Sequence, residues 1–240
     1  MDRSRKSKNK KKLIKDYIAV IPARGGSKGI KNKNMRKISN IPLVGHAINF
    51  AKSSKKVKKI YVSSDSNAIY NYVKNRKVNF ILRPKRLSTD KIMPDASVVH
   101  AIKEIDKNNI GFKYVVFIQS TSLLRKNKDL ENAIKKFEKY QYDSLFSGVN
   151  LHSMIWKLSK NKIRPLNFNI KKRLMRQDIK NKTILENGSF YITKRSIWLK
   201  KKQRCWGKIG FYEMNPLSIL EVDSKKDLET TRNILKFFKT

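Results

Sequence analysis

Cysteine is almost absent from this sequence of 240 residues, in which Cys205 is the single example. One cysteine can form neither an intrachain disulfide nor a thiolate metal cage, which fits a reducing cytosol. Long apolar runs are also absent. No segment approaches the roughly 20 residues that cross a bilayer, and the amino-terminal region lacks the apolar part of a signal peptide. We therefore expect a cytoplasmic protein without a membrane partner.

Acidic residues are scarce as well, with 18 Asp and Glu against 57 Lys and Arg and a formal net charge of +39. Such an excess is typical of proteins that bind a polyanion such as nucleic acid. It also arises when an AT-biased genome favours Lys, Asn and Ile. The cations are spread over nearly every expected helix without an aromatic-interleaved basic face, which favours the compositional explanation. We expect no nucleic-acid partner, although the positive field would steer an acidic small substrate.

Basic residues dominate the first fifteen positions, and the rest of the chain alternates between apolar and amphipathic stretches. We expect residues 1–15 to be a disordered arm, which would also suit a nuclear address in a eukaryote, and 16–240 to be one domain. Strands are predicted at 17–22, 59–63, 78–82, 114–119 and 143–149. Helices are predicted at 43–54, 67–75, 96–106 and 129–139, the last with Leu130, Ile134 and Phe137 on one face.

Strands that alternate with helices predict an α/β fold with right-handed crossovers and a mostly parallel, doubly wound sheet. Ligands bind such sheets at the carboxyl ends of the strands. The alternation breaks at 151–187, which we interpret as an excursion from the sheet, either a flap or a dimer arm. Strands at 188–193 and 209–214 and a closing helix after Ser224 complete the prediction.

The first predicted strand runs into a loop with three glycines and several cations, V-I-P-A-R-G-G-S-K-G-I-K-N-K-N-M-R at 20–36. It matches neither the P-loop pattern nor the dinucleotide pattern G-x-G-x-x-G. Glycines let backbone N–H groups approach an anion, and Arg24 and Lys28 would neutralise a di- or triphosphate. The alternative is an ordinary glycine turn with solvated cations. The loop therefore indicates a phosphate site without naming the reaction.

Two carboxylates close the short apolar segment S-I-L-E-V-D at 218–223. Alternation along a strand would put Glu221 and Asp223 on the same side, where they could share a hard cation such as Mg²⁺ or Mn²⁺. The alternative is a strand end whose acids precede and cap a helix. His46, His100 and His152 lack metal-ligand spacing, and no Ser/Cys–His–Asp arrangement is evident. An activated side-chain nucleophile is therefore not expected.

Several ordered segments together resemble the CMP-N-acylneuraminate (CMP-sialic acid) synthetase family, from residue 17 to 230. They are I-P-A-R-G-G-S-K-G-I at 21–30 with K-N at 33–34, I-P-L-V-G-H-A-I at 41–48, V-S-S-D-S at 62–66, L-R-P at 82–84, Q-S-T-S-L-L-R at 119–125, R-Q-D at 176–178, E-N-G-S-F-Y-I-T-K-R at 186–195 and G-K-I-G-F-Y-E-M at 207–214. No single segment identifies the family, but the number and the order of the segments do.

The resemblance implies a fold of the nucleotide-diphospho-sugar transferase type and a Mg²⁺-dependent homodimer. The anomeric hydroxyl of N-acylneuraminate would attack the α-phosphorus of CTP, giving the CMP-sugar and diphosphate. Positioning and charge stabilisation would carry the catalysis, because the substrate supplies the nucleophile. A sibling enzyme for legionaminate, pseudaminate or Kdo is the alternative within this class. An alternative of another class is a basic nucleic-acid-binding protein on a degenerate transferase fold.

The resemblance also assigns residues, with Arg24, Lys28 and Asp223 as the catalytic group. The expected nucleotide-binding residues are Ala23, Arg24, Gly25, Ser27, Lys28, Asn34 and Arg83. The expected sugar-binding residues are Gln119, Thr121, Ser122, Arg125, Lys157 and Arg176, with Arg176 reaching the sugar carboxylate from the partner subunit. The expected metal ligands are Asp223 and Glu221.

Four positions depart from the family pattern. Ser120 and Leu123 stand where family members usually carry proline, as does Lys31 after S-K-G-I. Glu221 replaces the first aspartate of the usual D-x-D, and its longer side chain would shift the metal or bind it through water. Asp223 is therefore the firmer of the two ligand assignments.

Overall fold

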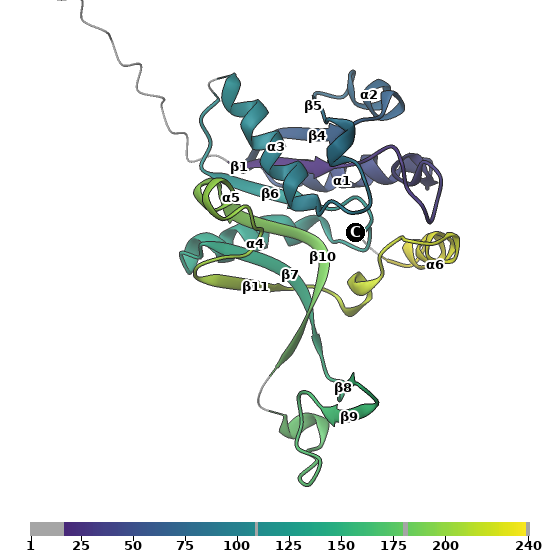
Figure 1. Cartoon of the computed structure of the whole chain (residues 1–240), viewed down its shortest axis with the longest axis vertical. Coiled ribbons are helices and arrows are strands. Elements are labelled where there is room, and N and C mark those ends of the chain that lie inside the picture. Colours follow the sequence, from purple (N-terminus) through teal and green to yellow (C-terminus); the bar gives the residue numbers. More distant parts are fainter. Residues whose placement is uncertain (1–16, 109, 180–181, 239–240) are drawn as a thin grey trace, which may run out of the picture.

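A seven-stranded sheet forms the centre of the molecule, a computed structural model that describes residues 17–108, 110–179 and 182–238 (Figure 1). Its strands, in spatial order, are β11 (Ile209–Glu213), β7 (Ser144–Leu151), β10 (Thr183–Lys194), β6 (Tyr114–Ile118), β1 (Tyr17–Pro22), β4 (Val57–Ser64) and β5 (Asn79–Leu82). Neighbouring strands are parallel except where β10 pairs with β6 and β7. The predicted mostly parallel sheet is confirmed. The predicted arm at 1–15 lies outside the described residues.

Helices cover both faces of this sheet. They are α1 (Leu43–Lys52), α2 (Asn67–Val73), α3 (Pro94–Lys107), α4 (Asn127–Lys139), α5 (Arg195–Lys201) and α6 (Lys225–Leu235). The residues of β1 are apolar without interruption because each face of the strand packs against helices. Ala19 and Ile21 join the cluster under α1 and α4, whereas Ile18 and Val20 join the cluster under α3 and α5. Both faces of β1 are thus buried, as a doubly wound sheet requires.

The predicted apolar stripe on α4 is confirmed, because Leu130, Ile134 and Phe137 are all buried against the sheet. A third, smaller cluster joins the carboxyl-terminal helix to the loop after β1. In it Leu228 and Leu235 of α6 pack on Ile30, Leu123 and Val222. This cluster brings the end of the chain to the carboxyl ends of β1 and β6.

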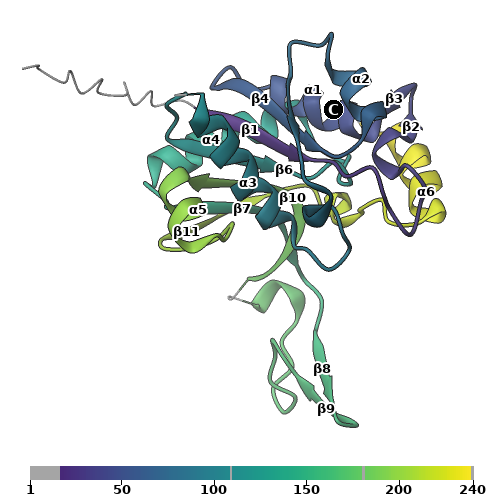
Figure 2. The ribbon, with the colours of Figure 1, turned by 45° about the horizontal axis from the view of Figure 1, so that its top comes forward.

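A long excursion leaves the sheet between β7 and β10 and projects away from the helices (Figures 1 and 2). We call residues 152–182 the arm. It contains the antiparallel pair β8 (Trp156–Ser159) and β9 (Lys162–Pro165), followed by the single turn η3 (Arg176–Asp178). Because the chain returns through the arm and not through a helix, β10 runs antiparallel to β7.

Two local predictions differ from the structure. The segment 218–223 is not a strand. Pro216–Ile219 form a 3₁₀ turn, capped by the side chain of Asn215, and Glu221 makes one isolated bridge with Ser122. Helix α5 was not predicted, since it has only seven residues, three of which are basic. In the described part of the chain, no helix combines the length and the apolar character that crossing a membrane demands.

Candidate functional site

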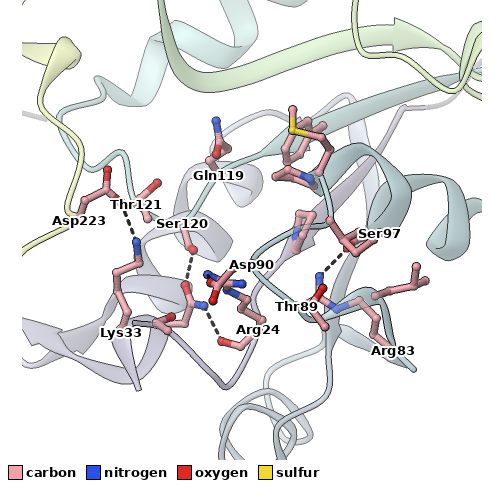
Figure 3. A pocket seen from close by; sticks show the side chains of 18 of the residues that line it. Arg24, Lys33, Arg83, Thr89, Asp90, Ser97, Gln119, Ser120, Thr121 and Asp223 are labelled. Atoms are coloured by element: carbon pink, nitrogen blue, oxygen red, sulfur yellow. Dashed lines mark hydrogen bonds and ion pairs between the residues drawn. The ribbon is translucent and has the colours of Figure 1, made fainter. Parts of the chain in front are cut away.

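A pocket of about 300 Å³ opens at the carboxyl ends of β1, β5 and β6 (Figure 3). The loops after these strands line it, together with the segment before α6. Eight predicted site residues contribute to its wall: Arg24, Ser27, Asn34, Arg83, Gln119, Thr121, Glu221 and Asp223. The structure therefore gathers residues from distant parts of the sequence at the edge where α/β sheets bind ligands.

The loop after β1 is tied down by hydrogen bonds. The Ala23 N–H donates to the Ser63 carbonyl at 2.9 Å, and the Gly25 N–H donates to Asp65 Oδ1 at 2.9 Å. Asn34, which is 5% exposed, donates from Nδ2 to the Arg24 carbonyl at 2.8 Å and accepts from Ser120 Oγ. Ala23 and Gly25 thus shape the loop, while Asn34 connects it to the end of β6.

Carboxylates pair with the cations of this loop (Figure 3). Arg24 and Lys28 both contact Asp90, the latter from Nζ to Oδ2 at 3.2 Å. Lys33 Nζ donates to Asp223 Oδ1 at 2.8 Å. The side chain of Lys28 is 87% exposed and lies at the rim. Asp90 was missed by the sequence reasoning because it lies in an irregular stretch 66 residues from Arg24.

Arg83 is the most buried cation of the pocket wall, with 4% of its surface exposed. Its Nη1 donates to Ser97 Oγ at 2.6 Å and its Nε donates to Ser88 Oγ at 3.1 Å. Burial lowers the pKa of the Arg83 guanidinium, and the nearby Asp65 partly opposes this shift. Its Nη2 lies 4.0 Å from Asp65 Oδ1, too far for a hydrogen bond, and within the described residues it has no hydrogen-bond partner. A buried donor without a partner at a pocket wall fits a ligand that supplies an acceptor oxygen.

The loop after β6 carries both exposed and buried polar groups. Gln119 and Thr121 line the pocket, whereas Ser122 and Arg125 are buried behind it. Arg125 donates from Nε to Ser189 Oγ at 2.8 Å and from Nη2 to the Ser189 carbonyl at 3.0 Å and the Gln119 carbonyl. Burial lowers the pKa of Arg125 to about 9. These contacts let Arg125 position the Gln119 backbone, and they do not bring its guanidinium to the pocket.

Glu221 and Asp223 both line the pocket, although the strand that was predicted to align them is absent. Glu221 Oε2 accepts from Thr121 Oγ1 at 3.3 Å. Its Oε1 lies against Gly188, whose φ is +64° and where a Cβ would come within 2.1 Å of that oxygen and 2.7 Å of Gln119 Nε2. Burial, with the negative charge of Asp223, raises the pKa of Glu221. Gly188 therefore makes the space that Glu221 and Gln119 occupy.

The chemistry of this pair fits a hard divalent cation. Carboxylate oxygens are the ligands that Mg²⁺ prefers, and such sites use one or two of them with water and substrate phosphates. Among the residues that the structure describes, no group of three or more His, Cys, Asp or Glu could hold a metal. A pair of carboxylates would leave coordination positions that phosphate oxygens and water could fill.

Lys157 and Arg176 belong to the arm. Lys157 lies on β8, opposite Arg164 of β9, and is exposed. The backbone of Arg176 begins the turn η3. Of the predicted sugar contacts, Gln119 and Thr121 thus line the pocket, Ser122 and Arg125 lie behind it, and Lys157 lies on the arm.

Comparison with known proteins places the whole described fold in one family. A model of the family described as cytidylyltransferase matches residues 18–239. The chain is 30% identical over 233 residues to N-acylneuraminate cytidylyltransferase A of Danio rerio, which covers 95% of this chain and 53% of that protein. It is 29% identical over 215 residues to N-acylneuraminate cytidylyltransferase of Streptococcus agalactiae, which covers 88% of this chain and 51% of that one. The chain spans about half the length of these curated relatives.

Solved structures show the same fold at low sequence identity. CMP:2-keto-3-deoxy-manno-octonic acid synthetase complexed with CTP matches with a TM-score of 0.67 and 15% identity, over 92% of this chain and 98% of that chain. A 4-diphosphocytidyl-2C-methyl-D-erythritol synthase matches with a TM-score of 0.67 and 10% identity, over 93% of this chain and 99% of that chain. With the family match, these likenesses lead to one conclusion: the chain belongs to the cytidylyltransferase family.

Proposed function

We propose that this protein transfers the cytidylyl group of CTP to the anomeric hydroxyl of N-acylneuraminate, giving CMP-N-acylneuraminate and diphosphate. The observation that carries the proposal is one pocket with three kinds of group. Arg24 and Lys33 supply positive charge, Gln119 and Thr121 supply neutral polar contacts, and two carboxylates lie beside them. The curated relatives are named for this activity.

The loop after β1 binds the phosphates of CTP in this proposal. Arg24, Lys28 and Lys33 neutralise them, and Asn34 keeps the loop in place through its bond to the Arg24 carbonyl. Arg83 offers its unsatisfied Nη2 to an oxygen of the nucleotide. Mg²⁺ or Mn²⁺ held by Asp223 and Glu221 would neutralise the charge that builds up on the phosphates. The anomeric oxygen forms a bond to the α-phosphorus as the bond to the diphosphate breaks.

The acidic sugar lies against Gln119 and Thr121 in this proposal, and the arm of a second copy completes its site. The arm of one chain projects away from its own sheet (Figure 1). It exposes large apolar side chains, including Leu158, Ile163 and Met175, which a partner would cover. Lys157 and Arg176 of that partner would then reach the sugar carboxylate. We propose a homodimer for this reason.

We also propose a reducing, cytoplasmic setting. Cys205 is half-buried, and burial raises the pKa of its thiol to about 12. A thiol of this kind stays protonated at neutral pH and is a poor nucleophile. Cys205 therefore behaves as a packing residue and takes no part in the proposed reaction.

A matrix of nucleotides and sugars tests the proposed function. Purified protein with Mg²⁺ is incubated with each of the four nucleoside triphosphates and with N-acylneuraminate, legionaminate, pseudaminate or Kdo. Mass spectrometry then identifies any nucleotide sugar. We expect a product only when CTP is the nucleotide and N-acylneuraminate is the sugar, namely CMP-N-acylneuraminate. A CMP-sugar formed only from one of the other acids would move the assignment to that sibling. The absence of any product, with nucleic acid bound instead, would overturn it.

A further inference from the structure

Asp90 contacts two cations of the loop after β1, Arg24 in the pocket wall (Figure 3) and Lys28 at its rim. Its Oδ1 pairs with Arg24 Nη2, and its Oδ2 lies 3.2 Å from Lys28 Nζ. One carboxylate thus places two oxygens on two different cations. This is the arrangement that two oxygens of a phosphate chain would adopt on the same side chains.

The segment that carries Asp90 is not fixed by regular structure. Asp90 follows the short turn η2 (Lys85–Leu87) and precedes α3, in a stretch of turns and bends. Its side chain is 37% exposed, and both of its described ion pairs go to the loop after β1. These contacts hold the pKa of Asp90 below its ordinary value, so that it stays ionised at neutral pH. Exposed ion pairs of this kind are individually weak, which makes them easy to exchange.

Asp90 and the phosphates of CTP therefore need the same donors. Two anions at one pair of cations repel each other, so binding of the phosphate chain requires Asp90 to leave. Resting on the proposed function, we propose that Asp90 is an internal substitute for phosphate. It occupies Arg24 and Lys28 in the nucleotide-free protein, yields them to CTP, and takes them back as diphosphate departs. In this role Asp90 sets how strongly the pocket holds triphosphate and diphosphate.

The exchange and a merely structural role of Asp90 predict opposite changes in CTP affinity when Asp90 is removed. If Asp90 only held Arg24 and Lys28 in place, its removal would loosen both cations and weaken CTP binding. If Asp90 competes with phosphate, its removal strengthens the binding of every ligand that reaches these cations. Cytidine carries no phosphate, so its affinity should not change in the second case.

Calorimetric titration of the full chain tests the exchange. CTP, inorganic diphosphate and cytidine are titrated into the wild-type protein, Asp90→Asn and Asp90→Ala. Asp106→Asn is the matched control, because it breaks a comparable Arg–Asp pair with Arg195 at the far end of α3. We expect the Kd for CTP and for diphosphate to fall by about threefold or more in both Asp90 variants, on the scale of exposed ion pairs. Cytidine binding and the Asp106→Asn protein should match the wild type.

Three results would overturn the exchange. If wild-type protein binds CTP but both Asp90 variants bind it equally well or more weakly, Asp90 does not compete with phosphate. An equal gain in affinity for cytidine would show that Asp90 acts on the pocket as a whole. A wild-type protein that binds no CTP would overturn the proposed function, and the exchange with it.

Discussion

The pocket and the arm differ in how firmly the chain holds their functional side chains. At the pocket Asn34, Arg83 and Arg125 are almost fully buried, and each is fixed by hydrogen bonds to other elements. On the arm Trp156 and Leu158 are 43% and 69% exposed, and within the described residues β8 pairs only with β9. The difference fits the proposal that one chain holds the nucleotide side of the site by itself and that the arm of a second copy completes the sugar side.

The largest effect is expected at Asp223, the proposed metal ligand of the pocket. Asp223→Asn should lower kcat by about 100-fold or more, the loss seen when a group that stabilises transition-state charge is removed. Its side chain is 71% exposed, so the fold should not change. Steady-state kinetics at saturating Mg²⁺ and a thermal melt measure the two quantities. Wild-type activity in the variant would show that Asp223 is not a metal ligand.

The packing behind the pocket should be the next most sensitive feature. Gly188→Ala would place a methyl group against Glu221 and Gln119 at a φ of +64°. We expect the free energy of unfolding to fall by about 1–3 kcal/mol, the cost of a strained backbone conformation. Gly26→Ala is the control, because no atom lies within 4 Å of a Cβ there. Equal urea midpoints for the two variants would contradict this account of Gly188.

The arm should affect the sugar and not the nucleotide. Arg176→Ala should raise the KM for N-acylneuraminate by about tenfold, since a charge-assisted hydrogen bond to its carboxylate is lost. The KM for CTP should stay at the wild-type value. Initial rates with each substrate varied in turn separate the two constants, and an unchanged sugar KM would count against the assignment.

Co-expression of two variants tests whether the arm of one chain completes the pocket of its partner. If the arm completes the partner's pocket, a dimer of one Asp223→Asn chain and one Arg176→Ala chain has one intact site. At sugar concentrations well below KM, where the Arg176→Ala site is slow, random pairing in a symmetric dimer then restores about a quarter of wild-type activity. If each arm serves its own chain, no mixed dimer has an intact site. The activity of the co-expressed pair would then not exceed that of the separate variants.

The smallest effect is expected at the rim. Lys28→Ala should raise the KM for CTP by about threefold, because an exposed cation contributes weakly. The difference from wild type should shrink as the salt concentration rises, since salt screens exposed charges. A loss as large as that of Asp223→Asn would show that Lys28 contacts the reacting phosphate directly.

Much of this architecture could be predicted because the sheet imposes patterns on the sequence. The run Tyr17–Pro22 is apolar throughout since both of its faces are buried, and its glycine-rich loop therefore had to lie at the carboxyl edge. The stripe on α4 follows from helical periodicity in the same way. For such features the pattern of apolar residues along the sequence is enough to predict which side chains are buried.

Contacts between distant irregular segments could not be predicted in this way. Asp90 lies in no periodic pattern, and only folding brings it to Arg24. The burial of Arg125 depends on Ser189, 64 residues further along the chain. At 218–223 the alternating pattern suggested a strand, but Pro216 and the cap at Asn215 favour a 3₁₀ turn. Alternation alone does not show whether a partner strand is available.

The fate of the phosphorus atoms of CTP is the most direct test of the proposed cytidylyl transfer to the sugar. The protein is incubated with Mg²⁺, N-acylneuraminate and CTP labelled at either the α- or the γ-phosphorus, and the products are separated. The account predicts the α label in the sugar nucleotide and the γ label in diphosphate, with no release of label when the sugar is omitted. Label from the γ position on the sugar, or release of phosphate without sugar, would contradict it.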